Sequence, residues 1–234
     1  MSGHVVLEGF HVVKHALRFG ATIHRVLVLD LAATLALAAS HAPDLLDEFT
    51  ARAEVVTPAE FSAVVGRTHP TGVAALADRS AERAPVTTSG RPAPLVLLDN
   101  PKNLGNLGAV IRVAAGLGAS GVVSLGDVDP WHPNVLRGSA GLHFALPVGR
   151  LADLDGLAGP VLAFDAGGED LRDAVIPDDA VLAFGSERHG LSDAVRAVAD
   201  RVLSIPMRDK VSSYNLTTSA AMALYHWDLR RRDS

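Results

Sequence analysis

The sequence predicts an α/β protein with a mostly parallel sheet in its C-terminal part, and two observations lead to this prediction. Short apolar runs repeat along that part, and helix-period stretches separate several of them; the runs are LVLL (95–98), GVVSL (121–125), VLAF (161–164), VLAF (181–184) and VLSI (202–205). Apolar strands that alternate with helices are typical of a parallel sheet covered on both faces. Ligands of such sheets bind beyond the carboxyl ends of the strands, so the informative residues should follow the apolar runs.

Composition limits the possible chemistry. The chain has 234 residues, of which 48% are hydrophobic and 20% charged, so it can form one large or two small domains around a real core. Cysteine is absent, which excludes disulfides, thiolate nucleophiles and cysteine-based metal sites. We expect a cytoplasmic protein with no membrane association, because no apolar stretch reaches the ~18 residues that span a bilayer and the N-terminus does not resemble a signal peptide.

The charge balance leaves nucleic-acid binding open. The net charge of −5 argues weakly against an RNA partner unless a local basic surface exists. The basic residues are 18 Arg and 3 Lys. Arginine is well suited to phosphate contacts and to stacking on bases, but an arginine-rich and alanine-rich chain is equally typical of a GC-rich genome.

A linker divides the chain. Residues 81–94, AERAPVTTSGRPAP, contain three Pro and a cluster of Ser and Thr, so we expect an N-terminal domain over 1–80 and a C-terminal domain over 95–234. The N-terminal segment predicts a small α/β module: a helix in EGFHVVKHALRFG that ends on Gly20, a strand in HRVLVLD, a helix in TPAEFSAVVG and a strand in GVAALAD. Thr57, Pro58 and Glu60 form a predicted capping box for the second helix. Six of the ten His lie in this segment, but in no metal-ligand spacing, and we expect no metal site.

The segment DNPKNLGNLGAVIR follows the first apolar run of the C-terminal part. We expect a helix to begin near Asn106, which would be its N-cap, and Arg112 is the lone charge between Leu104 and Gly126. The loop has a G-x-x-G spacing instead of the G-x-G-x-x-G of dinucleotide-binding proteins, which argues against an oxidoreductase. Taken alone, Arg112 could equally be a surface residue on a solvated helix face.

Two further loops carry polar residues at strand ends. VLAFGSERHGLSDAVRAVAD places Glu187 in such a loop and Ser192 at a predicted helix N-cap. LSIPMRDKVSSYNLTTSAAMALYHW places Ser213 and Asn215 just before an alanine-rich helix. A surface ion pair and ordinary capping residues are the alternative interpretations. Arg137 lies in a fourth loop, between two glycines, and this loop alone indicates no particular function.

Together these segments resemble the SpoU/TrmH family of RNA 2′-O-ribose methyltransferases. NLGNLGAVIR matches the family's first motif, FGSERHGLS its second, and IPMRDKVSSYNLTTSAAMALY its third, in the family's order across residues 95–228. LRGSAGLHFALPV also looks like the family segment after the first motif. The N-terminal segment, with THPTGVAAL at its end, is similar to the substrate-binding domain of the rRNA-directed branch.

The resemblance implies a fold and a reaction that the hydrophobic pattern of the sequence does not predict. The C-terminal domain would be an α/β-knot, a deep trefoil knot that binds S-adenosylmethionine, beside a small ribosomal-protein-like α/β domain. The protein would be a homodimer with its active site near the subunit interface, acting on RNA and specifically on rRNA. The catalytic positions would be Asn106, Arg112, Glu187, Ser213 and Asn215. The cofactor would contact Asp165, Ala166, Gly167, Phe184, Gly185, Ile205, Met207, Ser213 and Leu216.

The sequence departs from the family pattern at two positions, and two other functions are compatible with it. Many relatives have Gly where this chain has Asp209 and Leu where it has Tyr214, which puts the geometry of the third loop in doubt. A tRNA-directed methyltransferase is one alternative, disfavoured because minimal tRNA enzymes lack the N-terminal domain. A non-catalytic RNA-binding or assembly factor is another, disfavoured because every catalytic position is filled.

Arg112 poses the chemical question. The resemblance implies that Arg112 is the base that accepts the hydroxyl proton. A guanidinium, however, is a cation throughout the physiological pH range. We expect Arg112 to bind the phosphate beside the target ribose and to stabilise the developing alkoxide, with Asn106, Ser213 or water assisting proton loss. Glu187 would order the loop that carries Asn106.

Overall fold

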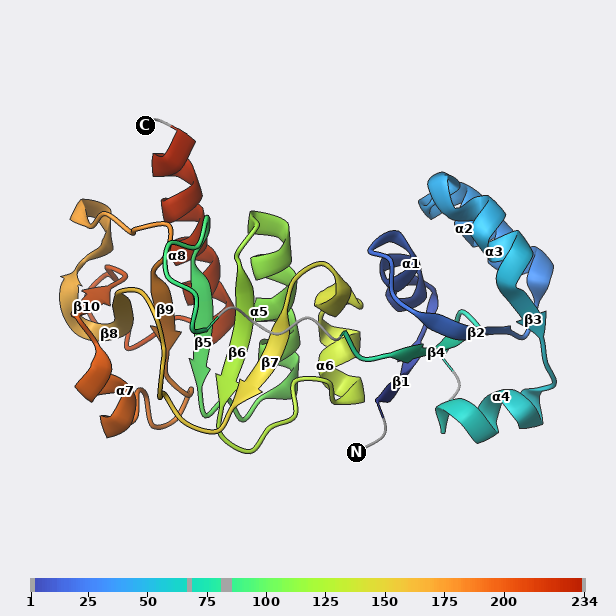
Figure 1. Cartoon of the computed structure of the whole chain (residues 1–234), viewed down its shortest axis with the longest axis horizontal. Helices are drawn as coiled ribbons and strands as arrows, with labels where there is room; N and C mark the ends of the chain where they lie inside the picture. The colour runs from blue at the N-terminus through green and yellow to red at the C-terminus, as the bar shows by residue number, and fades with distance from the viewer. Residues whose placement is uncertain (1–2, 67–68, 81–85, 233–234) are drawn as a thin grey trace.

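Two β-sheets lie side by side along the long axis of the molecule, as the computed structural model shows (Figure 1). The structure describes residues 3–66, 69–80 and 86–232. Within these residues, none of the helices combines the length and the hydropathy that a bilayer-spanning helix requires.

The N-terminal sheet has the strand order β1-β4-β2-β3. Its strands are β1 (His4–Glu8), β2 (Ile23–Val28), β3 (Ala53–Val55) and β4 (Val73–Asp78), with β4 antiparallel to both neighbours and β3 parallel to β2. Alternate residues of these strands join two different cores, one under helices α1 (Phe10–Arg18), α2 (Leu31–His41) and α3 (Leu46–Arg52), and one under α4 (Pro58–Val65). This alternation is expected when helices cover both faces of a sheet, because successive side chains of a strand point to opposite faces.

The N-terminal predictions are confirmed where a local signal exists. Thr57 and Glu60 form the expected capping box, with each side chain bonded to the other residue's backbone N–H. The strands in HRVLVLD and GVAALAD are β2 and β4, and the first predicted helix is α1. Strands β1 and β3 and helices α2 and α3 were not predicted; α2 is rich in Ala and Leu on all sides, so no amphipathic period marks it.

The C-terminal sheet is parallel throughout, in the order β10-β8-β9-β5-β6-β7, which confirms the predicted fold class. Its strands are β5 (Leu95–Asp99), β6 (Gly121–Leu125), β7 (Val148–Leu151), β8 (Val161–Asp170), β9 (Val181–Phe184) and β10 (Arg201–Ser204). The edge strand β7 was not predicted, because VGRL is short and contains a charge. The trefoil knot stays a prediction.

Helices cover both faces of this sheet. Helices α5 (Leu104–Leu117) and α8 (Leu216–Arg232) pack on one face and α7 (Asp193–Val198) on the other, while α6 (Pro133–Gly138) packs against α5. The approach of α6 to α5 is close: a Cβ at Gly108 would lie 2.5 Å from the carbonyl oxygen of Val135. This contact places α6 and the loop after it between the two sheets (Figure 1).

Residues 129–144 form a junction between the sheets. Trp131 and Leu136 belong to the apolar core of the N-terminal sheet, although they lie in the C-terminal half of the sequence. A His15 ring nitrogen lies 2.7 Å from the carbonyl oxygen of Ala140, and Arg79 pairs with Asp129 at 2.9 Å. The two sheets are therefore joined by packing as well as by the chain connection, of which residues 81–85 lie outside the described part.

His143 is fully buried at this junction. Its Nε2 lies 2.8 Å from the carbonyl oxygen of Pro130, which can only accept, so Nε2 carries the proton; Nδ1 lies 2.8 Å from the Ser139 hydroxyl. The ring also packs against Trp131, with centroids 4.9 Å apart. Burial lowers the pKa of His143 to about 4, so this imidazole is neutral at physiological pH.

Candidate active site

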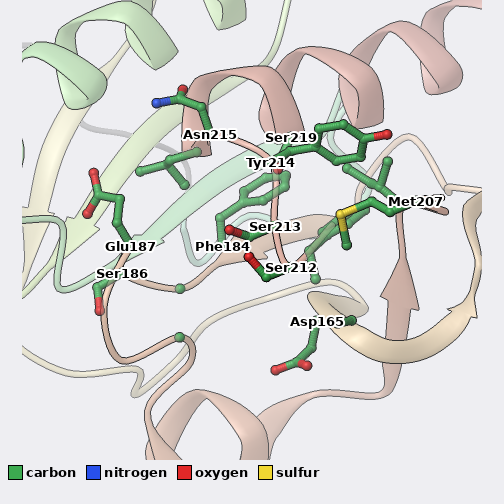
Figure 2. Close-up of a pocket in the computed structure, with 16 residues that line it drawn as sticks. Asp165, Phe184, Ser186, Glu187, Met207, Ser212, Ser213, Tyr214, Asn215 and Ser219 are labelled. Atoms are coloured by element: carbon green, nitrogen blue, oxygen red, sulfur yellow. The ribbon is translucent and has the colours of Figure 1, made fainter. Parts of the chain in front are cut away.

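A cavity of about 490 Å³ lies beyond the carboxyl ends of β9 and β10, beside the middle of β8 and the start of α8 (Figure 2). Its volume is that of an ordinary small-molecule site. Of the predicted cofactor positions, all but Gly167 line it; these are Asp165, Ala166, Phe184, Gly185, Ile205, Met207, Ser213 and Leu216. We call this cavity the first pocket.

The second motif folds into a tight turn that forms one wall of the first pocket. Ser186 and Gly190 exchange two backbone hydrogen bonds of 2.9 Å, which closes the turn. A Cβ at Gly185 would lie 2.1 Å from the carbonyl carbon of Gly190, so only glycine allows the chain to return so closely. The turn presents Glu187 at the rim of the pocket.

Three predicted catalytic residues meet at this rim. The Asn106 side-chain amide donates to Glu187 Oε1 at 2.6 Å, and the Asn215 amide donates to Asn106 Oδ1 at 3.2 Å. Asn215 Oδ1 in turn accepts from the backbone N–H of Thr217 at 2.8 Å, which fixes it at the start of α8. Residues from all three motifs are therefore linked in one hydrogen-bonded chain, and Ser213 lines the same pocket.

The start of α5 differs from the prediction. Asn103, not Asn106, is the N-cap: its Oδ1 accepts from the backbone N–H groups of Gly105 and Asn106, at 2.9 and 3.1 Å. Because the helix already has this cap, the Asn106 side chain is free to bond Glu187. The predicted cap at Ser192 is confirmed, since its side chain accepts from the N–H of Val195.

The charge lining the first pocket is negative. Asp165 pairs with Arg196 at 2.5 Å, and this guanidinium holds the pKa of the Asp165 carboxyl below its usual value. Glu187 contributes a second carboxylate, and Ser212, Ser213 and Ser219 contribute hydroxyls, while no Lys or Arg is found among the described residues that line the pocket. Figure 2 shows Glu187 and Asn215 at one end of the pocket and Asp165 toward the other. This environment suits a small molecule that carries positive charge and hydrogen-bonding groups.

The remaining wall of the first pocket is apolar. The rings of Phe164 and Phe184 stack with centroids 4.6 Å apart, and Ile205, Met207 and Leu216 complete the surface. Such side chains suit the flat rings of a nucleoside. Six residues that line the pocket were not predicted, although each lies within three positions of a predicted site residue: Phe164, Ser186, Gly190, Ser212, Tyr214 and Ser219.

Arg112 does not reach this pocket in its own chain. It lies six residues after Asn106 on α5, about 240° further around the helix, so it projects from another side. There it lines a second cavity, of about 510 Å³, between the two sheets. Arg112 is exposed and forms no hydrogen bond or ion pair with any residue in the described ranges.

Two histidines that show no metal-ligand spacing in the sequence converge in the structure. The carboxylate of Asp78 lies 2.6 Å from a His4 ring nitrogen and 2.8 Å from a His24 ring nitrogen, because β4 lies between β1 and β2. Hydrogen bonds account for this arrangement and lower the pKa of Asp78, His24 contributing more than His4. The cluster lies on the sheet of the N-terminal part and does not line either cavity.

Comparison with known families decides the affiliation of the chain. Residues 93–225, more than half of the chain, match the model of the SpoU rRNA Methylase family. The chain belongs to the SpoU rRNA methylase family. The resemblance carried by the three motifs is thereby confirmed.

Relatives within the SpoU family carry specific names. The chain is 34% identical over 144 residues to the 23S rRNA (uridine(2479)-2′-O)-methyltransferase of Streptomyces viridochromogenes, a match that covers 56% of this chain and 50% of that protein. It is 35% identical over 144 residues to the 23S rRNA (adenosine(1067)-2′-O)-methyltransferase of Streptomyces laurentii, covering 56% and 52%. The matched segment thus spans about half the length of these curated relatives.

A solved SpoU structure extends the similarity to the whole fold. The SpoU methyltransferase AviRb from Streptomyces viridochromogenes, crystallised in complex with the cofactor AdoMet, superposes with a TM-score of 0.80 at 25% identity. The superposition covers 100% of this chain and 92% of that chain, so it includes both sheets.

Proposed function

We propose that this SpoU protein transfers a methyl group from S-adenosylmethionine to a ribose 2′-hydroxyl in RNA, and specifically in large-subunit rRNA. The observation that carries the proposal is the hydrogen-bonded chain of Glu187, Asn106 and Asn215 at the rim of an acidic, hydroxyl-lined pocket. The names of the two Streptomyces relatives support the reaction and the rRNA substrate. The AdoMet complex of AviRb supports the donor.

The residues of the first pocket fit this donor. When bound, S-adenosylmethionine supplies a methyl group on a positively charged sulfur, which is already activated for transfer. Glu187, which has no cationic partner among the described residues, provides negative charge for a cation, whereas Asp165 already pairs with Arg196. The apolar wall with Ile205, Met207 and Leu216 provides a surface for the adenine ring. Gly185 allows the turn of the second motif to close against Gly190, and this turn forms one wall of the donor pocket.

The residues of this chain must position the ribose 2′-hydroxyl and assist the removal of its proton. As the bond between methyl carbon and sulfur breaks and its electron pair stays on sulfur, the ribose oxygen forms the new bond and loses its proton. Holding two reactants in this alignment lowers a barrier by ~7–11 kcal/mol. Glu187 holds Asn106 in place, and Asn106, Ser213 or a water molecule assists the departure of the proton.

We propose that Arg112 contacts the RNA strand that carries the acceptor ribose, which we call the acceptor strand. Its guanidinium matches a phosphate group, and it stabilises the alkoxide that develops as the proton leaves. Because Arg112 lies away from the first pocket of its own chain, this role requires a homodimer in which Arg112 of one copy serves the pocket of the other. Exposed Tyr225 and Leu229, four residues apart on α8, and exposed Val211 and Tyr214 before it offer apolar surface for such a dimer.

The two parts of the chain divide the work in this proposal. Residues 1–80 form the RNA substrate-binding domain, 81–94 the linker, and 95–234 the methyltransferase domain. An rRNA substrate places the reaction in the cytoplasm, where ribosomes assemble.

Transfer of a labelled methyl group tests the proposed function. Purified protein is incubated with S-adenosylmethionine labelled in the methyl group and with large-subunit rRNA or total tRNA, and the position of 2′-O-methylation is mapped. Label in a ribose of the rRNA supports the proposal, whereas label in tRNA alone supports the tRNA alternative. Thermal unfolding with and without the donor is measured in parallel, because a ligand that binds the folded state stabilises it. No donor-dependent stabilisation and no label would identify a non-catalytic RNA-binding factor.

Mixed dimers test the role of the second copy. Arg112→Ala and Asn215→Ala are each expected to be inactive as pure proteins. If Arg112 acts across the dimer, mixing and reassociating the two variants restores one intact site in each heterodimer, about a quarter of all sites. Absence of recovery, with subunit exchange verified by mass, would mean that Arg112 acts within its own chain or not at all.

A further inference from the structure

The second cavity lies between the two sheets and is lined from both. The N-terminal part contributes Gly9, Val12, His11, Lys14, His15 and His69, and the C-terminal part contributes Arg112, Arg137 and Ala140. Among the described residues that line it, Glu8 is the one acid, and it pairs with Arg137 at 2.7 Å. We call this cavity the interdomain pocket.

Two of the three Lys and Arg residues that line the interdomain pocket have no acidic partner within hydrogen-bond distance among the described residues. Lys14 and Arg112 form no hydrogen bond or ion pair with residues of the described ranges. Burial lowers the pKa of Lys14, and the nearby charges of Arg18 and Arg112 lower it further, against an opposing effect of Asp44. Burial also lowers the pKa of His11, helped by Lys14, His41, Arg112 and His69. In a protein of net charge −5, two cations without an acidic partner, Lys14 and Arg112, line one hollow, and this indicates an anionic ligand.

His69 has a fixed orientation in this pocket. Its Nδ1 accepts from the backbone N–H of Thr71 at 3.3 Å, so the proton of the neutral ring is on Nε2. The ring lies against Gly9, where a Cβ would come within 2.8 Å of it, and this contact holds the ring in place. Nε2–H has no acceptor among the described residues and is therefore available to a ligand oxygen.

We propose that the interdomain pocket binds a backbone phosphate of the substrate RNA, held between Lys14 of α1 and Arg112 of α5 with His69 as a third donor. The inference rests on the proposed function for the identity of the RNA and deepens it by assigning substrate contacts to the N-terminal part. A phosphate carries the charge and the several acceptor oxygens that these three groups can bind together. Because Arg112 is also the residue assigned to the acceptor strand, the same contact sets the position of the RNA relative to the methyl donor.

The salt dependence of RNA binding tests this assignment. Binding of in vitro transcribed large-subunit rRNA to the full chain is measured without donor between 50 and 300 mM KCl. Each phosphate contact contributes about 0.7–0.9 to the slope of log K against log salt, which corresponds to roughly fivefold to eightfold in affinity at 0.1 M salt. Lys14→Ala is therefore expected to weaken binding by about that factor and to lower the slope by nearly one. Lys14→Arg should retain both quantities.

Arg52→Ala is the matched control. It removes one positive charge from the same part of the chain, but Arg52 pairs with Glu48 at the end of α3 and does not line the pocket. Its slope and affinity should equal those of the wild type. A wild-type slope for Lys14→Ala, or an equal loss for Arg52→Ala, would overturn the assignment; circular dichroism and thermal unfolding verify that each variant is folded.

Two further measurements separate the sources of an effect. Added inorganic phosphate at constant ionic strength should compete with rRNA for the wild type and less for Lys14→Ala. Donor binding should be the same in Lys14→Ala and in the wild type. If the wild type binds no donor while the slope still falls, the proposed function fails and the pocket assignment stands. If the wild type methylates rRNA while Lys14→Ala keeps the full slope, only the pocket assignment fails.

Discussion

The first pocket and the interdomain pocket have nearly the same volume, about 490 and 510 Å³, but their charged lining residues are of opposite sign. The first pocket is lined by two carboxylates and several hydroxyls and lies within the C-terminal sheet and its loops. The interdomain pocket is lined by Lys14, Arg112, Arg137 and histidines and exists only because the two sheets pack together. The difference in charge matches the two ligands proposed above, a cationic methyl donor in the first pocket and a polyanionic RNA at the interdomain pocket.

The strongest test of this separation is Arg112→Lys. The variant keeps the charge but loses the planar pair of donors that binds a phosphate, and a small misplacement of the acceptor costs ~100-fold in turnover. We expect about that loss in methylation rate with unchanged affinity for S-adenosylmethionine, measured by isothermal titration calorimetry. Turnover close to that of the wild type would remove Arg112 from the reaction.

Gly185→Ala tests whether the turn of the second motif is needed for donor binding in the first pocket. The new methyl group would meet the carbonyl carbon of Gly190 at 2.1 Å, so the turn of the second motif must open. Such overpacking costs ~1–3 kcal/mol, and we expect donor affinity to fall by at least ~tenfold while rRNA affinity is retained. Gly116→Ala is the control, because a Cβ there meets no atom within 4 Å and Gly116 lines neither pocket. Equal donor affinities for the two variants would contradict the role of this turn.

Acidification tests the junction that creates the interdomain pocket. The folded-state pKa of His143 is about 4, below the ordinary value of 6.5, so the unfolded chain binds the proton more readily. Stability from this group is complete above pH 6.5 and is lost as the pH falls toward 4, by about 2 kcal/mol at pH 5. Urea unfolding of the wild type and of His143→Gln at pH 7.5 and 5.0 measures this loss, which should be smaller in the variant. The same pH dependence in both proteins would show that other groups cause it.

Glu187→Gln has the smallest expected effect and distinguishes two roles of Glu187. The amide oxygen of glutamine can still accept the hydrogen bond from Asn106 but carries no charge. If Glu187 mainly orders Asn106, turnover should fall by only about threefold to fivefold, whereas Glu187→Ala should lose much more. A Gln variant as defective as the Ala variant would assign the role of Glu187 to its negative charge.

The sequence by itself determined the elements that have a local cause. Apolar runs predicted five of the six strands of the parallel sheet, and Thr57 and Glu60 predicted a capping box. Three loop motifs predicted the family, and the resemblance to that family implied ten of the sixteen residues that line the first pocket. These signals are local because burial of a strand, a helix cap and a tight glycine turn each depend on residues a few positions apart.

Only the tertiary structure decided which distant groups meet. Asn106 bonds Glu187 and Asn215 across 81 and 109 positions, and the cap at Asn103 frees Asn106 to do so. The helix geometry of α5 turns Arg112 away from that cluster, but the fact that it faces Lys14 and His69 follows from the packing of Trp131 and Leu136 into the N-terminal core. Contacts of this kind depend on how two sheets fit together, and no local pattern in either segment encodes that fit.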